Sequence, residues 1–188
     1  AVKPKAVRAS SVAGTSATKG NAEMMPSFKD VPRPALILGL GGLVPFYAIS
    51  LPIWLTDPLY SPVLIDSLIT YGAAILSFLG AVHWGAAMWQ GELEEAREED
   101  DEEMDRAAWA RYGWSVVPAL IAWIGTLLGP FFGLVLITLG IALAYFVDVR
   151  ACNAGFLPEW YAKLRKWLTI LALIALANAA IGGAVTPY

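Results

Sequence analysis

The sequence predicts an all-α membrane protein with five transmembrane helices, an extended N-terminal tail and an acidic loop between the second and third helices. The 188 residues are 57% hydrophobic. Their mean hydropathy of +0.58 exceeds what the core of a soluble domain requires. Several stretches are apolar for about 20 residues, which is the length of helix that crosses a bilayer. The basic residues are confined to alternate connections between these stretches, and this pattern sets the number of passes.

Residues 1–34 carry no apolar periodicity and contain four prolines, so we expect an extended tail. The tail is rich in Ala, Ser and Lys and poor in acidic residues, like an organellar transit region cut within or just upstream of this sequence. Its scarcity of arginine favours a plastid over a mitochondrion, and a bacterial tail is the third interpretation. Since the tail cannot bury a core of its own, we expect it to dock on a neighbouring subunit through Lys3, Lys5, Arg8 and Lys19.

The five-helix transmembrane domain is predicted to cover residues 35–188. Its first span is 35–55, in which Pro45 should kink the helix because it removes a backbone donor. A short turn follows, with Asp66 as the N-cap of the second helix. The second span, 67–90, contains no Lys, Arg, Asp or Glu. Its small residues recur on successive turns, so we expect this helix to lie inside the bundle, because small side chains let helices approach closely in lipid.

Residues 91–106 carry ten carboxylates and two arginines, which no bilayer core would accept, so they are predicted to form an aqueous loop. Part of this loop is expected to be helical, because Glu102 and Arg106 have the favourable i,i+4 orientation. Most such runs are simply solvated. The alternative is that the run docks on a basic partner surface, for which the candidates are Glu98, Glu99, Asp100 and Asp101. A metal site is not predicted, because the run lacks the glycine and the alternating spacing of a calcium loop.

The third and fourth spans are predicted at 112–128 and 131–147, joined by a tight turn at Gly129 and Pro130. Asp148 and Arg150 end the fourth span. The next stretch is expected to be an interfacial anchor, formed by Trp160, Tyr161, Lys163, Arg165, Lys166 and Trp167.

The fifth span is predicted at 168–185. Asn178 is its only strongly polar side chain, and we expect it to form a hydrogen bond to another helix.

Five spans place every Lys and Arg of the chain on one side of the membrane, whereas four or six spans would break this partition. Basic residues accumulate on the face that is not translocated. The N-terminus should therefore face the stroma or matrix and the C-terminus the lumen or intermembrane space. We expect a multi-pass organellar membrane protein, with the thylakoid favoured and the mitochondrial inner membrane second.

His83 is the only histidine of the chain and lies about 10 Å inside the second span. Ionisable residues within a membrane are functional candidates. The imidazole could form a hydrogen bond to a Ser, a Tyr or a carbonyl of a neighbouring helix, ligate the magnesium of a chlorophyll or a haem iron, or handle protons. His83 is therefore the pigment-binding candidate, and chlorophyll is the candidate cofactor.

The sequence contains no nucleophile paired with a base, no phosphate-binding loop and no Cys/His cluster, so we do not expect an enzyme. A net charge of −3 gives no indication of nucleic-acid binding. We expect a non-catalytic accessory or structural subunit of a large organellar membrane complex, surrounded by other subunits and lipids. A thylakoid photosystem supercomplex is favoured over a respiratory or ATP-synthase complex. The alternative is a small membrane carrier or an assembly factor, which would need a polar cavity around His83 and Asn178.

Four segments carry a family resemblance: LGLGGLVPF at 38–46, YGAAILSFLGAVHWGAAM at 71–88, WSVVPALIAW at 114–123 and VDVRACNAGFLPEWYAKLRKWLT at 147–169. Together they resemble the domain-of-unknown-function family typified by transmembrane protein 69, over roughly residues 35–185. The resemblance implies a five-helix topology in a bacterial or organellar membrane and no particular chemistry. The tail and the acidic loop look like additions to the family pattern.

Overall fold

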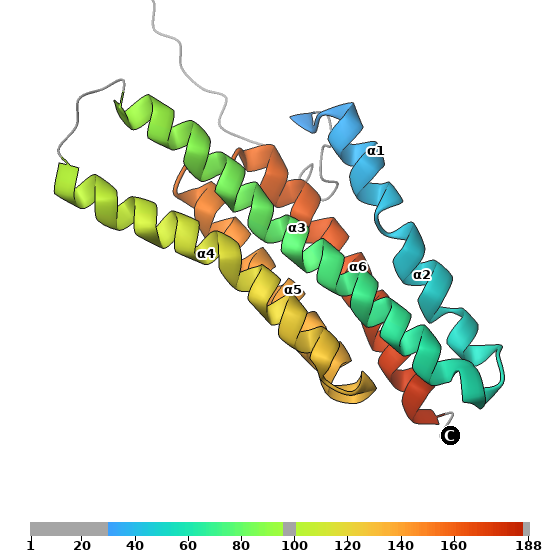
Figure 1. Cartoon of the computed structure of the whole chain (residues 1–188). Coiled ribbons are helices and arrows are strands. Elements are labelled where there is room, and N and C mark those ends of the chain that lie inside the picture. The colour runs from blue at the N-terminus through green and yellow to red at the C-terminus, as the bar shows by residue number, and fades with distance from the viewer. Residues whose placement is uncertain (1–29, 96–100, 186–188) are drawn as a thin grey trace, which may run out of the picture.

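The computed structural model describes residues 30–95 and 101–185, and these residues form helices joined by short connections. The helices pack as five rods, because α1, α2 and η2 form a single interrupted rod (Figure 1). The predicted all-α membrane fold is thereby confirmed. The elements are α1 (Arg33–Gly41), α2 (Val44–Ser50), η2 (Pro52–Trp54), η3 (Pro58–Tyr60), α3 (Ser61–Glu95), α4 (Asp101–Leu127), α5 (Pro130–Asn153) and α6 (Glu159–Val185).

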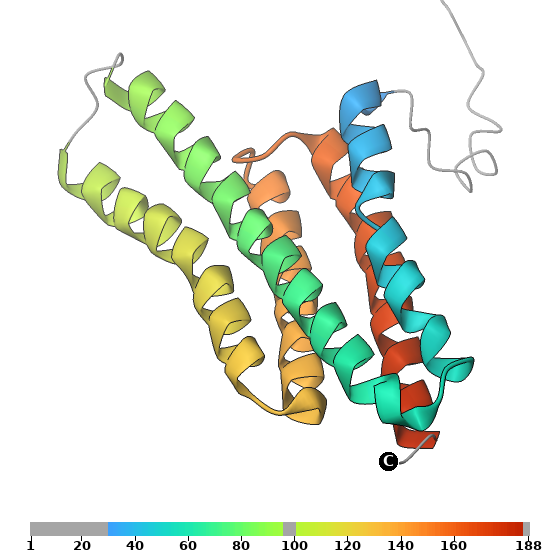
Figure 2. The same cartoon turned by 45° about the vertical axis from the view of Figure 1, so that its right-hand side comes forward.

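Four rods of the described chain are long and apolar enough to cross a membrane, namely Arg33–Trp54, Pro58–Glu92, Pro130–Asn153 and Glu159–Val185. The fifth rod, α4, is apolar only over its second half, because its first half carries Arg106 and Arg111. Figures 1 and 2 show α4 running back beside α3 to a tight turn into α5. Since α3 ends and α5 begins at opposite ends of the bundle, α4 has to span the distance between them.

The first rod is interrupted at Gly42 and Leu43, next to the predicted kink at Pro45. Pro45 cannot donate a backbone hydrogen bond, so the chain starts a new helix there. The carbonyl of Gly42 accepts a hydrogen bond from the Tyr71 hydroxyl at 2.8 Å. Another hydroxyl, that of Tyr47, donates to the Leu171 carbonyl at 3.0 Å. The broken rod is thus tied to both α3 and α6.

One predicted boundary is wrong. Helix α3 begins at Ser61, so Asp66 lies inside the helix and is not its N-cap. The reason is Pro62, because proline is well suited to the first turn of a helix. The acidic segment 91–106 is partly helical, as expected, since α3 continues to Glu95 and α4 starts at Asp101. Glu, Ala, Met and Arg are all good helix formers.

Small residues let α3 approach its neighbours, although not every small residue of the span faces a neighbour. A Cβ on Gly80 would overlap the backbone oxygen of Ser115, and one on Gly72 would lie 2.6 Å from Ile137. These glycines therefore allow the close contacts of α3 with α4 and α5. Gly85, by contrast, has nothing within 4 Å of its Cβ position. Gly85 therefore lies outside the packing face, whereas Ala87, further along the same span, is buried.

The interior of the bundle is apolar, with fully buried Leu68, Leu76, Ile137, Ile141 and Leu176 at its centre. The outer surface is also apolar and includes exposed Trp123, Phe131, Phe132, Leu139 and Ile174. Such a surface is unfavourable in water but suited to lipid.

Candidate functional site

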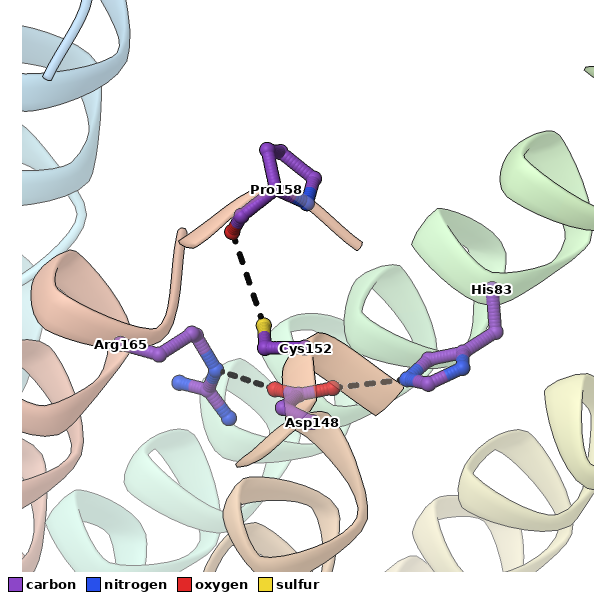
Figure 3. Close-up of polar contacts among 5 residues, drawn as sticks. All are labelled: His83, Asp148, Cys152, Pro158 and Arg165. Carbon is purple, nitrogen blue, oxygen red and sulfur yellow. Dashed lines mark hydrogen bonds and ion pairs between the residues drawn. The ribbon is translucent and has the colours of Figure 1, made fainter. Parts of the chain in front are cut away.

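A buried ionic cluster of His83, Asp148 and Arg165 joins three helices near one end of the bundle (Figure 3). One carboxylate oxygen of Asp148, Oδ1, lies 2.7 Å from His83 Nε2, and the other, Oδ2, accepts a hydrogen bond from Arg165 Nε at 2.7 Å. The exposed fractions are 4% for His83, 1% for Asp148 and 5% for Arg165. An ionised carboxylate can only accept, so Nε2 of His83 carries the shared proton.

The connection between α5 and α6 sets Asp148 opposite Arg165. Gly155 adopts a φ of 76°, a left-handed conformation that glycine reaches without strain. The amide of Gly155 donates to the Cys152 carbonyl and that of Phe156 to the Ala151 carbonyl. This pair of bonds is the Schellman motif, which ends a helix and reverses the chain. The Cys152 thiol also contacts the Pro158 carbonyl at 3.6 Å (Figure 3).

Aromatic rings cover the imidazole of His83. The ring of Phe156 stacks on it with centroids 6.0 Å apart, and Trp114 meets it edge-on at 6.4 Å. His83 also lines a cavity of about 400 Å³, together with Gln90, Arg111, Trp114, Arg150 and Phe156. Phe156 belongs to the turn that positions Arg165, so one short connection shapes both sides of the cluster.

Because the cluster is buried, the stability of the fold depends on all of its charges being paired. Moving charges out of water is costly, and removing one partner of a buried pair typically destabilises a protein by about 3–5 kcal/mol. Arg165 lies six residues into α6, about 9 Å along the helix, which places the cluster inside the bundle close to its charged end. Chemically, the arrangement can fix three helices, hold a proton between His83 and Asp148, and offer the remaining donors of Arg165 to a ligand.

Sequence analysis identified only one member of the cluster, His83. Asp148 was assigned to the end of a span, and both Arg165 and Tyr161 to an interfacial anchor. That assignment is wrong for Arg165, which is buried and bonded to Asp148. The signal lay in the symmetry of the hairpin, because Asp148 is five residues before the end of α5 and Arg165 is six after the start of α6. Opposite charges at nearly equal distances from a tight antiparallel turn lie at a similar depth.

Asn178 forms the second polar junction of the bundle. Its Oδ1 accepts a hydrogen bond from Trp54 Nε1 at 3.1 Å, and its Nδ2 donates to the Ser50 carbonyl at 3.1 Å. Asn178 thereby links α6 to η2 and the end of α2. No group of three or more His, Cys, Asp or Glu residues that could hold a metal ion occurs in the described part of the chain.

The predicted docking residues are largely outside the described residues. This holds for the tail residues Lys3, Lys5, Arg8 and Lys19 and for Glu98, Glu99 and Asp100, while Asp101 is the first residue of α4.

Comparisons with known proteins agree with the helical architecture. The profile of a family described as "Protein of unknown function (DUF3429)" matches residues 31–181. Transmembrane protein 69 of Xenopus tropicalis is 34% identical over 164 residues, covering 86% of this chain and 59% of the relative. Transmembrane protein 69 of Mus musculus is 31% identical over 146 residues, covering 78% and 55%. The chain therefore spans less than two thirds of the length of these relatives. No solved structure matches it.

Proposed function

The chain belongs to the DUF3429 family of membrane proteins, and from that premise we propose that it is a non-catalytic accessory subunit of a large organellar membrane complex. That the protein is a multi-pass membrane protein follows from its helices and its relatives. The subunit role rests on one observation, which is an acidic arm that projects from the bundle.

The acidic arm is segment 91–106, of which the structure describes residues 91–95, at the end of α3, and residues 101–106, at the start of α4. Helix α3 has 35 residues and is therefore about 52 Å long, whereas the hydrocarbon core is about 30 Å thick. Figures 1 and 2 show the ends of α3 and α4 reaching beyond the α5–α6 turn. The two described helix ends protrude, and segment 91–106 has ten carboxylates in its sequence. This combination suits docking on a basic surface of a partner, because complementary charges speed encounter and fix orientation.

The buried ionic cluster supports a static subunit over a carrier. Both oxygens of Asp148 are bonded, to two different helices, and the carboxylate is 1% exposed. A carrier moves charges or polar groups along a path and needs helices that shift around a central site. A carboxylate held from both sides opposes such a shift.

The organelle and the complex stay predictions. The transit-like tail favours a thylakoid photosystem supercomplex, with a mitochondrial inner-membrane complex second. Chlorophyll ligation by His83 also stays a prediction. Because Nε2 of His83 faces Asp148, a chlorophyll magnesium would have to be ligated through Nδ1.

The test removes four of the ten carboxylates of the arm without changing its length, in the variant Glu98→Gln/Glu99→Gln/Asp100→Asn/Asp101→Asn. On blue-native gels of mildly solubilised membranes, we expect the wild-type chain in a high-mass band and the variant mainly as free protein. Salt should have the same effect on the wild type, since the screening length falls to about 3 Å at 1 M.

The matched control is Asp57→Asn/Asp66→Asn, which removes charge at the opposite end of the bundle and should leave the high-mass band intact. Asn is itself a good capping residue, so η3 should keep its cap at position 57. Migration of the wild-type chain only as a free monomer would refute the subunit role, and an unchanged band for the arm variant would refute docking through the arm.

A further inference from the structure

An apolar cavity of about 340 Å³ reaches the buried ionic cluster through Arg165. It is bounded by α1, α2, α3, α5 and α6, and its volume lies within the range typical of ligand pockets. Apart from Tyr161, Arg165 and the indole of Trp160, its lining is apolar or glycine. The apolar part of the lining includes Phe46, Phe78 and Val82.

Two hydrogen-bond donors of the cavity lining have no partner among the described residues. They are Arg165 Nη2 and the Tyr161 hydroxyl, and both atoms are buried. Arg165 as a whole is 5% exposed and uses its Nε for Asp148. Residues four apart on a helix lie on the same face, so Tyr161 and Arg165 can donate to one acceptor. Buried donors are nearly always paired in folded proteins, which points to an acceptor supplied by a ligand.

The charge balance decides what kind of acceptor fits. Asp148 already compensates the charge of Arg165, to which it is bonded. An anionic head group would leave a net negative charge in a buried apolar site, which is strongly unfavourable. A neutral carbonyl oxygen can accept from both donors without this penalty.

The depth and shape of the cavity restrict the ligand further. Tyr161 and Arg165 lie two and six residues into α6, within about 10 Å of its start along the axis. An acceptor there would sit just inside the hydrocarbon region. Aromatic side chains of the lining favour a flat ring, because rings pack well face to face and edge to face. We propose that this cavity binds an isoprenoid quinone, with one ring carbonyl accepting hydrogen bonds from Tyr161 and Arg165 and the tail leaving toward the lipid.

The experiment titrates the full chain in phosphatidylcholine nanodiscs with decylubiquinone, following quenching of tryptophan fluorescence and the shift in Tm. We expect saturable binding by the wild type. Tyr161→Phe, which removes one neutral hydrogen bond and no charge, should weaken binding about five-fold. Arg165→Lys, which keeps the charge but loses the second nitrogen, should weaken it by at least about ten-fold.

Thr169→Val is the matched control. It removes another buried hydroxyl that has no partner among the described residues. Thr169 lies about two helical turns after Tyr161 and outside the cavity lining. The substitution should therefore leave the affinity for the quinone unchanged. Circular dichroism establishes that each variant is folded. If Arg165→Lys does not fold, the affinity of Tyr161→Phe alone tests the binding site.

Parallel titrations use dioleoylglycerol, which has ester carbonyls but no ring, and dioleoylphosphatidic acid, which is anionic.

Three results would overturn the proposal. The first is the absence of saturable quinone binding by the wild type. The second is an equal affinity for Tyr161→Phe and Thr169→Val. The third is binding of either lipid as tightly as the quinone, which would contradict the argument from ring shape or from charge.

Discussion

Two of the polar junctions that fasten α6 to the rest of the bundle differ in what they bury. The ionic cluster joins Arg165 to Asp148 and His83, and all three residues are at most 5% exposed. The neutral junction joins Asn178 to Trp54 and Ser50, and Trp54 is 44% exposed. One junction holds charges away from water, while the other holds amide and indole groups near the surface of the bundle.

Polar contacts in a membrane bundle therefore differ in how much they contribute to the free energy of unfolding. Interhelical hydrogen bonds between neutral groups contribute on average about 0.6 kcal/mol in a bilayer, since the separated helices find other partners. A buried charge that loses its partner finds none at that depth. We therefore expect the charged junction to dominate the stability of the fold, and three substitutions test that comparison in decreasing order of effect.

The largest effect is expected for Arg165→Ala. It leaves the Asp148 carboxylate with His83 as its one described partner, so the free energy of unfolding should fall by about 3–5 kcal/mol. Steric trapping in bicelles measures this quantity directly. Arg150→Ala is the control, because the Arg150 guanidinium is exposed and lies over the Phe146 ring at 4.2 Å. It should cost no more than about 1 kcal/mol.

A compensating variant separates the unpaired charge from the loss of packing. The double substitution Arg165→Met/Asp148→Leu removes both charges and keeps apolar volume, so most of the lost stability should return. If the double variant were as unstable as Arg165→Ala, the loss would come from packing of the Arg165 side chain, and the contrast between the junctions would lose its basis.

His83→Leu should have an intermediate effect. The substitution deletes the hydrogen bond to Asp148 Oδ1 but leaves Asp148 paired with Arg165. A hydrogen bond to a charged group contributes about 1.5–3 kcal/mol, and the same steric-trapping measurement should show a loss in this range. A loss as large as that of Arg165→Ala would mean that His83, rather than Arg165, stabilises the carboxylate.

The sequence was sufficient for the architecture because hydropathy and the placement of Lys and Arg act over whole segments. Five passes and the tight turn at Gly129 and Pro130 followed from that information. Boundaries were less predictable, since Pro62 can either end a turn or begin a helix, and only packing decides. The sequence also does not show which small residues of a span face a neighbouring helix, and Gly85 does not.

The site was predictable only in part, for a physical reason. His83 stood out as an ionisable residue within an apolar span, whereas Asp148 and Arg165 stood beside other charges at the ends of spans. Near the interface a long basic side chain normally reaches out to the head groups, and nothing local distinguishes one that turns inward. The distinction depends on which helix faces it, which is tertiary information.

The smallest effect is expected for Asn178→Leu, and it completes the comparison. The substitution removes both contacts of Asn178, which would suggest a large loss if every hydrogen bond counted equally. The Ser50 carbonyl is a backbone group near the end of α2, and the half-exposed Trp54 indole can turn toward head groups or water. Leucine is also more favourable than asparagine in contact with lipid.

The expected loss of stability is therefore about 0.6 kcal/mol and at most about 1.7 kcal/mol, measured by steric trapping. Trp54→Phe, which removes one of the two contacts, is measured beside it. A loss for Asn178→Leu that equals that of Arg165→Ala would show that contact number rather than buried charge sets the strength of these junctions.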